Sequence, residues 1–329
     1  MAFSPPTAPG LDLYAPIAAD LAEVERILAH VLKNKHPRVA EVVDHVHHYR
    51  GKRLRPMLLL LTARACGRMT PAHHVLGAVV EMIHTATLVH DDVLDGARVR
   101  RRVATVNSVW GVQTSVLLGD YLFTHAFHLA STLGDPRACR LIGEATDRVC
   151  EGELCQVLER GNLELCEEDY FDIIDGKTAA LTACCCHLGA LYSGASAEVV
   201  QALVRYGRCV GQAFQIADDL LDLIGEEKMT GKSLGTDLEQ QKMTLPLIYL
   251  LTKGDRNVVS KMRQILSSPA NHKREALQPY LMEVEAIAYA RSRAVELAAQ
   301  ARQELGCLAA SPCRTLLEAL TERIIHRNA

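Results

Sequence analysis

The spacing of apolar residues constrains the fold of this 329-residue chain more than any other feature of its sequence. Apolar residues recur every three or four positions through most of the chain, for example at Leu21, Val24, Ile27, Leu28 and Val31. This is the repeat of an amphipathic helix, whereas the strict alternation that is typical of strands is scarce. The pattern therefore predicts an all-α fold.

Glycine, proline and aspartate interrupt the helical pattern and predict where the helices end. The interruptions lie at Gly51, Gly67 to Pro71, Gly96, Gly134 to Pro136, Gly161, Gly194, and Gly225 to Gly235. The segments between them predict helices at residues 16–34, 37–48, 54–66, 71–95, 105–132, 136–159, 167–192, 196–225, 238–253, 255–267 and 275–327, the last broken at least once.

The composition favours one large domain. Hydrophobic residues make up 49% of the chain, which is ample for a large core, and no proline-rich or glycine- and serine-rich linker divides the interior. Only the opening segment MAFSPPTAPG, which contains three prolines, has the composition of a disordered tail. We therefore expect residues 1–14 to be disordered and residues 15–329 to form a single helical domain.

Charge and hydropathy exclude several classes of partner. A net charge of −3 is too small for a surface that binds nucleic acid. The N-terminus has no basic segment followed by an apolar one, and no stretch of about eighteen residues is apolar throughout. The sequence therefore predicts a soluble, cytoplasmic protein without stable membrane insertion.

The eleven cysteines do not predict a disulfide framework or a zinc site. Cys184, Cys185 and Cys186 are consecutive, and no CxxC pair occurs in the chain. Disulfide scaffolds and metal sites need spaced cysteines. We expect reduced and buried thiols that act as small apolar residues.

Two acidic motifs of the form DDxxD occur, in LVHDDVLDG and in QIADDLLDL. Positions four apart share a helix face, so Asp91 lies with Asp95, and Asp218 lies with Asp222. Stacked like charges destabilise a helix, and oxygen ligands without histidine or cysteine favour Mg²⁺. For one motif alone, a solvated acidic helix end is an equal alternative. The apolar residues before Asp91 argue against it, since they are typical of a buried helix.

Basic residues gather in three segments that contain glycine. YRGKRLRP places Lys52 and Arg55 beside the start of an apolar helix, where charged side chains and helix N–H groups can hold phosphate. DGKTAAL contributes Lys177, and GKSLGTDLEQQKMTLP contributes Lys232 and Lys242. Taken singly, each segment is explained better as a solvated basic turn. Together with the acidic motifs they predict one site for two polyanions, one bound through metal ions and one through direct contacts with cations.

These residues resemble the trans-isoprenyl diphosphate synthases, specifically the polyprenyl synthases. The segments GKRLRP, IHTATLVHDDVLD, LLGDYL, GELCQ, GKTAAL, GQAFQIADDLLD and GKSLGTDLEQQKMTLPL follow one another in the order and approximate spacing of that family, between about residues 49 and 250. The resemblance implies a prenyltransferase with the isoprenoid synthase fold, which is one bundle of antiparallel helices around a deep central cavity. It also implies a homodimer.

The resemblance further implies a reaction and its residues. An allylic diphosphate would ionise with the help of about three Mg²⁺ ions, and isopentenyl diphosphate would add to it head-to-tail. The implied metal ligands are Asp91, Asp92, Asp95, Asp218, Asp219 and Asp222. The implied contacts of isopentenyl diphosphate are Lys52, Arg55, His84 and Arg101. Those of the allylic diphosphate are Arg100, Lys177, Thr178, Gln215, Lys232 and Lys242. The implied catalytic residues are Asp91, Asp95, Asp218, Lys177 and Lys232.

The chain departs from the family at one position. The family has a glycine after two consecutive arginines, whereas here Arg102 follows Arg100 and Arg101. If the backbone at that position has a positive φ, Arg102 carries a small conformational strain.

Two small residues before the first acidic motif predict a long product. Thr87 and Ala86 precede Asp91 by four and five positions, and each earlier residue lies about 1.5 Å deeper along the helix. Short-chain members of the family carry aromatic rings there, which block the growing tail. We therefore expect a long-chain all-trans polyprenyl diphosphate, with a farnesyl or geranylgeranyl product as the alternative. Larger residues further along would form the floor of the tunnel, such as Met82, Phe123 or Phe127.

Two other functions agree less well with the motifs. A class I terpene cyclase also ionises an allylic diphosphate, but it has no use for GKRLRP, and its second metal motif normally mixes asparagine, serine or threonine, and glutamate. A non-catalytic subunit of a heteromeric synthase commonly loses one acidic motif, and both are intact here. The elongating enzyme is therefore the favoured interpretation.

Overall fold

The computed structural model describes residues 12–33, 35–47, 49, 51–225, 234–268 and 273–325. Almost all regular structure in these ranges is helical, which confirms the predicted all-α fold. The first elements are a 3₁₀ turn (Ala15–Ile17), α1 (Ala18–Val31), α2 (Pro37–His47), α3 (Leu54–Ala65), α4 (Pro71–Leu94), β1 (Val99–Arg100), β2 (Val103–Ala104), α5 (Val106–Ser131) and α6 (Pro136–Leu158). The next are α7 (Glu167–Ile174), a π turn (Asp175–Ala179), α8 (Ala180–Tyr192), α9 (Ala197–Ile224), α11 (Thr236–Glu239) and α12 (Leu245–Lys253). The last are α13 (Arg256–Ser267), α14 (Lys273–Glu283), α15 (Ala286–Glu304), a 3₁₀ turn (Leu305–Cys307) and α16 (Pro312–Ile325).

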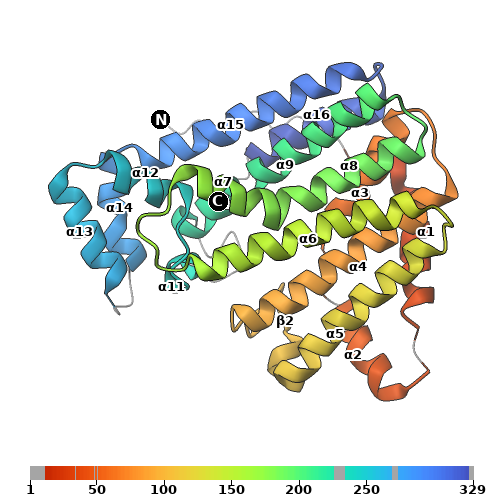
Figure 1. Cartoon of the computed structure of the whole chain (residues 1–329), viewed down its shortest axis with the longest axis horizontal. Coiled ribbons are helices and arrows are strands. Elements are labelled where there is room, and N and C mark those ends of the chain that lie inside the picture. The colour runs from red at the N-terminus through yellow and green to blue at the C-terminus, as the bar shows by residue number, and fades with distance from the viewer. Residues whose placement is uncertain are drawn as a thin grey trace.

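The long helices run roughly along one another (Figure 1). Helix α3 packs against α4 and α8, α8 packs against α9, and α9 packs against α15. The side chains of residues 57–61 in α3 are all fully buried. A helix that is apolar on every side is covered by neighbours on every side, so α3 lies in the interior of the bundle. No helix in the described part of the chain is both long and apolar enough to cross a bilayer.

Capping residues determine where several helices begin. Thr70 precedes α4, and its backbone N–H donates to Nδ1 of His73 over 2.9 Å. Asp135 and Ser196 cap α6 and α9 by accepting from backbone N–H groups of the first turn. These caps satisfy donors that have no partner within the helix. The predicted breaks before these three helices are therefore confirmed.

Three predicted helices are interrupted. The helix predicted at residues 167–192 is divided into α7 and α8 by the π turn. The one predicted at 238–253 separates into α11 and α12, because Pro246 in the first turn of α12 lacks an N–H to continue a preceding helix. The one predicted at 275–327, with at least one break, comprises α14, α15 and α16, which confirms the break. Glu285 between α14 and α15 is left-handed with φ of 56°.

Residues 12–14, part of the predicted disordered tail, are ordered. Residues 1–11 of the predicted disordered tail lie outside the described residues. Leu13 is only 5% exposed, and the hydroxyl of Tyr14 donates to the backbone carbonyl of Lys52 over 2.5 Å. Residues 12–14 therefore pack against the body of the protein rather than belonging to a tail.

All eleven cysteines are free thiols. The consecutive cysteines on α8 are buried, as predicted. The prediction of burial is wrong for four others, which lie on the outer face of α6, at the cap of α7 and in the 3₁₀ turn after α15, where no neighbouring element covers them. These exposed thiols are Cys150, Cys155, Cys166 and Cys307.

A tight hairpin follows α4. Strand β1 pairs antiparallel with β2, and the turn between them consists of Arg101 and Arg102, with φ of 51° and 67°. Positive φ at both positions is the type I′ geometry, which favours glycine and asparagine. The strain expected at Arg102 is therefore confirmed, at the position where the family has glycine.

Replacing Arg102 with glycine is expected to stabilise the protein. A residue with a Cβ in the left-handed region costs about 1 kcal/mol, and the greater freedom of glycine in the unfolded chain offsets part of that gain. We expect Arg102→Gly to raise the free energy of unfolding by about 0.5 kcal/mol, measured by urea denaturation. Val103→Gly in β2 is the matched control and should lower it. A lower value for Arg102→Gly as well would contradict the strain.

Candidate active site

The first acidic motif lies at the C-terminal end of α4. Burial raises the pKa of Asp91 to about 7; the ammonium of Lys177 opposes this shift, and the carboxylates of Glu153 and Asp95 add to it. Carboxylates raise one another's pKa when they lie close together in a buried place. Burial therefore outweighs the nearby ammonium in setting the pKa of Asp91.

Asp92 forms an ion pair with Arg100 of the hairpin. Its side chain is 1% exposed, and Oδ1 accepts from Nε of Arg100 over 2.7 Å. Oδ2 is buried without a hydrogen-bond partner among the described residues. The predicted metal ligand Asp92 thus serves here as the counter-ion of Arg100, a predicted diphosphate contact.

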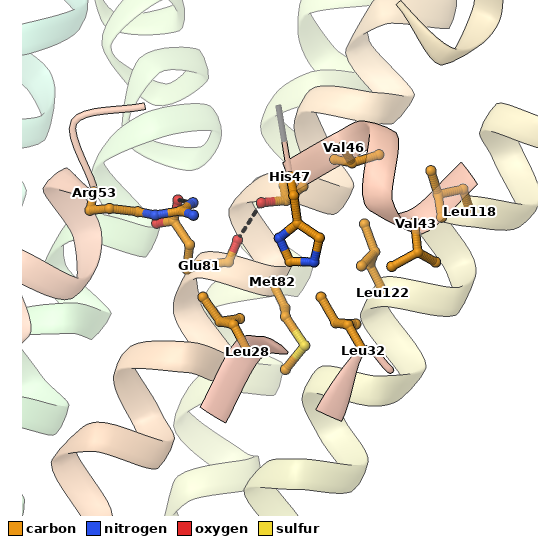
Figure 2. Close-up of a pocket in the computed structure, with 11 residues that line it drawn as sticks. Leu28, Leu32, Val43, Val46, His47, Arg53, Glu81, Met82, Leu118 and Leu122 are labelled. Atoms are coloured by element: carbon orange, nitrogen blue, oxygen red, sulfur yellow. Dashed lines mark hydrogen bonds and ion pairs between the residues drawn. The ribbon is translucent and has the colours of Figure 1, made fainter. Parts of the chain in front are cut away.

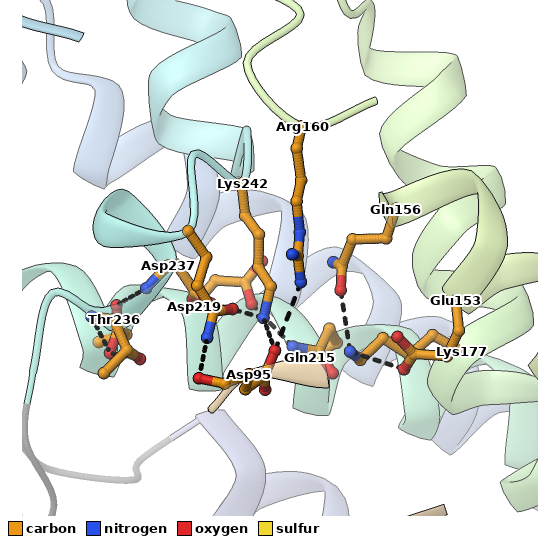
Figure 3. Close-up of polar contacts among 12 residues, drawn as sticks. Asp95, Glu153, Gln156, Arg160, Lys177, Gln215, Asp219, Thr236, Asp237 and Lys242 are labelled. Atoms are coloured by element: carbon orange, nitrogen blue, oxygen red, sulfur yellow. Dashed lines mark hydrogen bonds and ion pairs between the residues drawn. The ribbon is translucent and has the colours of Figure 1, made fainter. Parts of the chain in front are cut away.

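Asp95 meets two cations that come from distant parts of the chain (Figure 3). Nζ of Lys242 and a terminal nitrogen of Arg160 each lie 3.5 Å from Oδ1 of Asp95. The same Nζ of Lys242 lies 3.6 Å from Oδ1 of Asp237. Lys242 therefore joins the end of α4 to the segment that follows α9. Arg160 was not predicted, and its buried Nε has no hydrogen-bond partner within the described ranges.

The second acidic motif lies near the end of α9 and is bound from two sides. The hydroxyl of Tyr170 donates to Oδ2 of Asp219, and Nε2 of Gln215 donates to Oδ1, each over 2.7 Å. Oγ1 of Thr178 in turn donates to Oε1 of Gln215 over 2.7 Å. Burial raises the pKa of Asp219 to about 8, and Asp237 adds to the shift. The predicted residues Gln215 and Thr178 thus join the motif, together with the unpredicted Tyr170.

Asp222 caps the short helix α11. Its Oδ1 accepts from Oγ1 of Thr236 and its Oδ2 from the backbone N–H of Asp237, both over 3.0 Å. Carboxylates stabilise helix starts in this way. Burial raises the pKa of Asp237 to about 6, with Asp222 and Asp218 adding to the shift. Asp237 is therefore a further acidic residue of this wall, and as a lone aspartate it gave no periodic signal in the sequence.

Lys177 is positioned by a close contact between the π turn and α6. A Cβ on Gly176 would lie 2.7 Å from the carbonyl oxygen of Arg148, and one on Gly152 would collide with the backbone nitrogen of Lys177. Only glycine permits this approach at the two positions. Turns of π geometry are rare, and those that occur are often found at functional sites.

The ammonium of Lys177 has two polar partners on α6 (Figure 3). Its Nζ lies 2.6 Å from Oε1 of Glu153 and 2.9 Å from Oε1 of Gln156. Burial opposes the charge, but Glu153 and Asp91 outweigh it and raise the pKa of Lys177 above its ordinary value. Lys177 therefore stays charged at neutral pH. Glu153 and Gln156 belong to the segment GELCQ, to which the sequence assigned no role in the site.

Arginines surround His84 on the other side of α4. Burial and four positive charges hold the pKa of His84 well below its ordinary value. The charges are those of Arg55, Arg101, Arg100 and Arg53. Burial also lowers the pKa of Arg55, whose Nε has no hydrogen bond to any residue that the structure describes. The predicted residues Arg55, His84 and Arg101 thus lie together in a region of excess positive charge, which suits an anion.

For two of the predicted lysines, the described residues give no contact with the site. Lys52 is exposed, and Lys232 lies outside the described residues. Arg53, next to Lys52, is left-handed with φ of 47°. Its guanidinium lies 2.6 Å from Glu81 and 2.5 Å from Glu25, so it is already paired with carboxylates.

The donor set of the acidic walls fits magnesium. Within the described ranges, no three acidic, histidine or cysteine side chains converge closely enough to hold an ion as they stand. Mg²⁺ usually takes only one or two carboxylates and completes its shell with water and substrate phosphates. The raised pKa of the buried Asp91, and the oxygen of Asp92 that has no hydrogen-bond partner among the described residues, indicate carboxylate oxygens that a cation would satisfy.

The residues predicted to border the product tail lie in or beside the core. Ala86 is fully buried, and the hydroxyl of the half-buried Thr87 donates to the carbonyl of His84 over 2.8 Å. Phe123 and Phe127 are partly buried against the core.

Met82 lines a hollow deeper in the bundle (Figure 2). Its walls come from α1, α2, α4 and α5 and include Leu28, Val43, Leu118 and Leu122. The space measures about 30 Å³, which is room for about one water molecule. Methionine is flexible and readily adapts its shape, so the hollow is space into which Met82 can move.

Comparisons with known proteins agree with this geometry. The family model described as polyprenyl synthetase matches residues 36–283. The chain is 34% identical over 314 residues to the octaprenyl diphosphate synthase of Escherichia coli, covering 94% of this chain and 97% of that one. The crystal structure of a decaprenyl diphosphate synthase from Rhodobacter capsulatus matches with a TM-score of 0.91 at 36% identity, covering 96% and 98% of the two chains. A polyprenyl synthase from Caulobacter crescentus, complexed with calcium and isoprenyl diphosphate, matches with a TM-score of 0.91 at 32% identity, covering 99% and 100%.

Proposed function

The chain belongs to the polyprenyl synthetase family of trans-isoprenyl diphosphate synthases, and from this we propose that it is a Mg²⁺-dependent, long-chain polyprenyl diphosphate synthase. It condenses isopentenyl diphosphate with an allylic diphosphate and releases pyrophosphate. The octaprenyl and decaprenyl synthases that it resembles support a long product over a farnesyl or geranylgeranyl one. The cytoplasmic location expected from the sequence stays a prediction.

The single observation that carries the proposal is the convergence of two acidic walls on Lys242. Its Nζ lies 3.5 Å from Asp95 on α4 and 3.6 Å from Asp237 after α9. Carboxylates from both walls therefore border one space, in which a diphosphate and its metal ions can be held together. We take Asp91, Asp95 and Asp218 as the main ligands.

The allylic diphosphate meets positive charge from the protein as well. Bound Mg²⁺ supplies charge that stabilises the departing pyrophosphate. Lys177, kept protonated by Glu153, and Lys242 add two fixed ammonium groups at the same place. Such preorganised charge is most effective where the bond breaks.

Isopentenyl diphosphate is held on the arginine side of α4. The buried Nε of Arg55 has no hydrogen-bond partner in the described part of the chain, and an anion would satisfy it. Burial and the surrounding arginines lower the pKa of His84 and keep it neutral, so it can donate one N–H without adding charge. The allylic C–O bond breaks, pyrophosphate departs with the bonding electrons, and the double bond of isopentenyl diphosphate attacks the resulting allylic cation. A proton lost to pyrophosphate then restores the alkene. No protein nucleophile is needed.

The test is incubation of the purified protein with Mg²⁺, labelled isopentenyl diphosphate and geranyl, farnesyl or geranylgeranyl diphosphate. Labelled products longer than geranylgeranyl support the proposal. A cyclic hydrocarbon formed without isopentenyl diphosphate would indicate a terpene cyclase. The absence of extended product from every primer would contradict chain elongation.

We further propose that the protein is a homodimer paired through α5. This helix exposes a row of apolar side chains, of which Leu117 is 66% exposed. Exposed apolar clusters of this kind mark interfaces, and a two-fold axis covers the same patch on both copies. The other members of the row are Val112 and Val116, which lie with Leu117 after the non-helical Gly111 that breaks α5.

Leu117→Asp is expected to separate the dimer. A charge placed in a buried apolar interface costs about 2 kcal/mol or more, roughly a 30-fold rise in the dimer Kd. Sedimentation velocity at micromolar concentration measures the mass. Leu158→Asp makes the same change at a leucine on α6 that is 80% exposed, and should leave the mass unchanged. A monomeric parent, or a dimer that survives Leu117→Asp, would refute this interface.

A further inference from the structure

Tyr170 is a buried polar residue beside the second acidic motif. Its side chain on α7 is 3% exposed, and its hydroxyl donates to Oδ2 of Asp219 over 2.7 Å. The other oxygen of Asp219 accepts from Gln215 over 2.7 Å. With one donor on each oxygen, the carboxylate of Asp219 is held in a single orientation, and α7 is tied to α9 at the motif.

The hydrogen bonds continue from Asp219 to the π turn. Gln215 donates to Asp219 through its nitrogen, so its oxygen is available on the other side of the amide. That oxygen accepts from Oγ1 of Thr178 over 2.7 Å. A chain of three hydrogen bonds therefore runs from Tyr170 through Asp219 and Gln215 to Thr178, the residue that follows Lys177.

We propose that Tyr170 is a positioning residue that fixes the second acidic motif relative to the π turn. Asp218 precedes Asp219 on α9, and Lys177 precedes Thr178 in the turn. Hydrogen bonds that fix Asp219 and Thr178 therefore also fix the backbone positions of Asp218 and Lys177. These two residues face the same diphosphate under the proposed function, on which this inference rests. Misplacement by about 1 Å can cost a site much of its activity. Tyr170 itself does not contact the substrate.

A second buried tyrosine provides a matched comparison. Tyr206 is fully buried on α9, and its hydroxyl donates to the backbone carbonyl of Leu317 over 2.9 Å. Each tyrosine therefore loses one buried hydrogen bond when phenylalanine replaces it. Only Tyr170 has an acidic side chain as its partner, so only its loss should reach the diphosphate site.

The experiment compares Tyr170→Phe with Tyr206→Phe by steady-state kinetics. We expect Tyr170→Phe to raise the Mg²⁺ concentration for half-maximal activity and the KM for the allylic diphosphate about tenfold, the size seen when outer partners of metal ligands are removed. The KM for isopentenyl diphosphate should change by less than about twofold, since that side is formed by α3, α4 and the hairpin. Tyr206→Phe should leave all three values unchanged.

A binding measurement decides the inference independently of turnover. Titration calorimetry of inorganic pyrophosphate in the presence of Mg²⁺ should show about tenfold weaker binding to Tyr170→Phe than to Tyr206→Phe. Equal binding by the two variants would overturn the inference, as would an equal rise in KM for both substrates. An inactive parent would contradict the proposed function, and the titration would still test Tyr170. If Tyr170→Phe does not fold, Gln215→Met breaks the same chain and must give the same selective loss.

Discussion

Asp91→Asn is expected to abolish chain elongation, with kcat/KM for the allylic diphosphate lower by about 10³-fold or more, roughly 4 kcal/mol of transition-state stabilisation. Asparagine keeps the shape of the side chain and removes its charge. Mg²⁺ is held by few carboxylates, so the loss of one of them weakens the binding of both metal and diphosphate. Incorporation of labelled isopentenyl diphosphate measures the effect.

The same variant is expected to be more stable than the parent in EDTA. The pKa of Asp91 is about 7 in the folded protein, against 3.8 for an ordinary aspartate. The folded state therefore binds the proton more tightly than the unfolded state does, and stability falls as the pH rises from about 4 to about 7. Above pH 7, the ionised carboxylate of Asp91 lowers the stability of the folded protein by its full amount. The asparagine side chain carries no charge, so at pH 8 the variant should melt at a higher temperature than the parent.

Asp147→Asn is the control for both measurements. Asp147 is exposed on α6 and lies outside the site, so activity and melting temperature should stay close to those of the parent. Elongation that persists in Asp91→Asn would remove Asp91 from the metal ligands. Equal melting temperatures of the Asp91 variant and the parent would mean that its carboxylate is not crowded.

Ala86→Phe is expected to shorten the product to farnesyl or geranylgeranyl length. Ala86 is fully buried and lies five residues before Asp91, which is about 7.5 Å along the helix. A phenyl ring there would fill the space that the tail enters after one or two additions. Mass spectrometry of the dephosphorylated products measures their length.

The loss of stability caused by a large phenyl ring in the core requires its own control. Overpacking a core position costs about 1–3 kcal/mol, so Ala298→Phe makes the same change at a residue on α15 that is 3% exposed. It should lower stability without changing product length. Thr87→Phe, at a half-buried position, should shorten the product with less loss of stability. If both α4 variants made the parent's product, the tail would not pass these positions.

Periodicity predicted the helices well because caps and breaks are local. Pro71 and Pro136 open helices where the sequence indicated. The π turn could not be predicted, since it depends on contact between Gly176 and Gly152 from different helices. No spacing within the sequence reveals such a contact.

The acidic motifs could be predicted in the same way, because their carboxylates repeat at helical spacing. Several of their partners could not. Tyr170, Arg160 and Asp237 come close to the motifs only through packing of distant segments. Helical spacing also placed Asp222 on the face of Asp218, but did not reveal that its oxygens cap α11.

Lys242 gives the two acidic walls an internal counter-ion, since its ammonium lies between Asp95 and Asp237. A metal ion at these carboxylates would therefore compete with an ammonium that is already in place. Its affinity would be the difference between two electrostatic attractions, and lower than the carboxylates alone would give. Asp95 or Asp237, once drawn toward a metal, would leave the ammonium of Lys242 to the diphosphate, so that metal binding and the availability of the lysine would be linked.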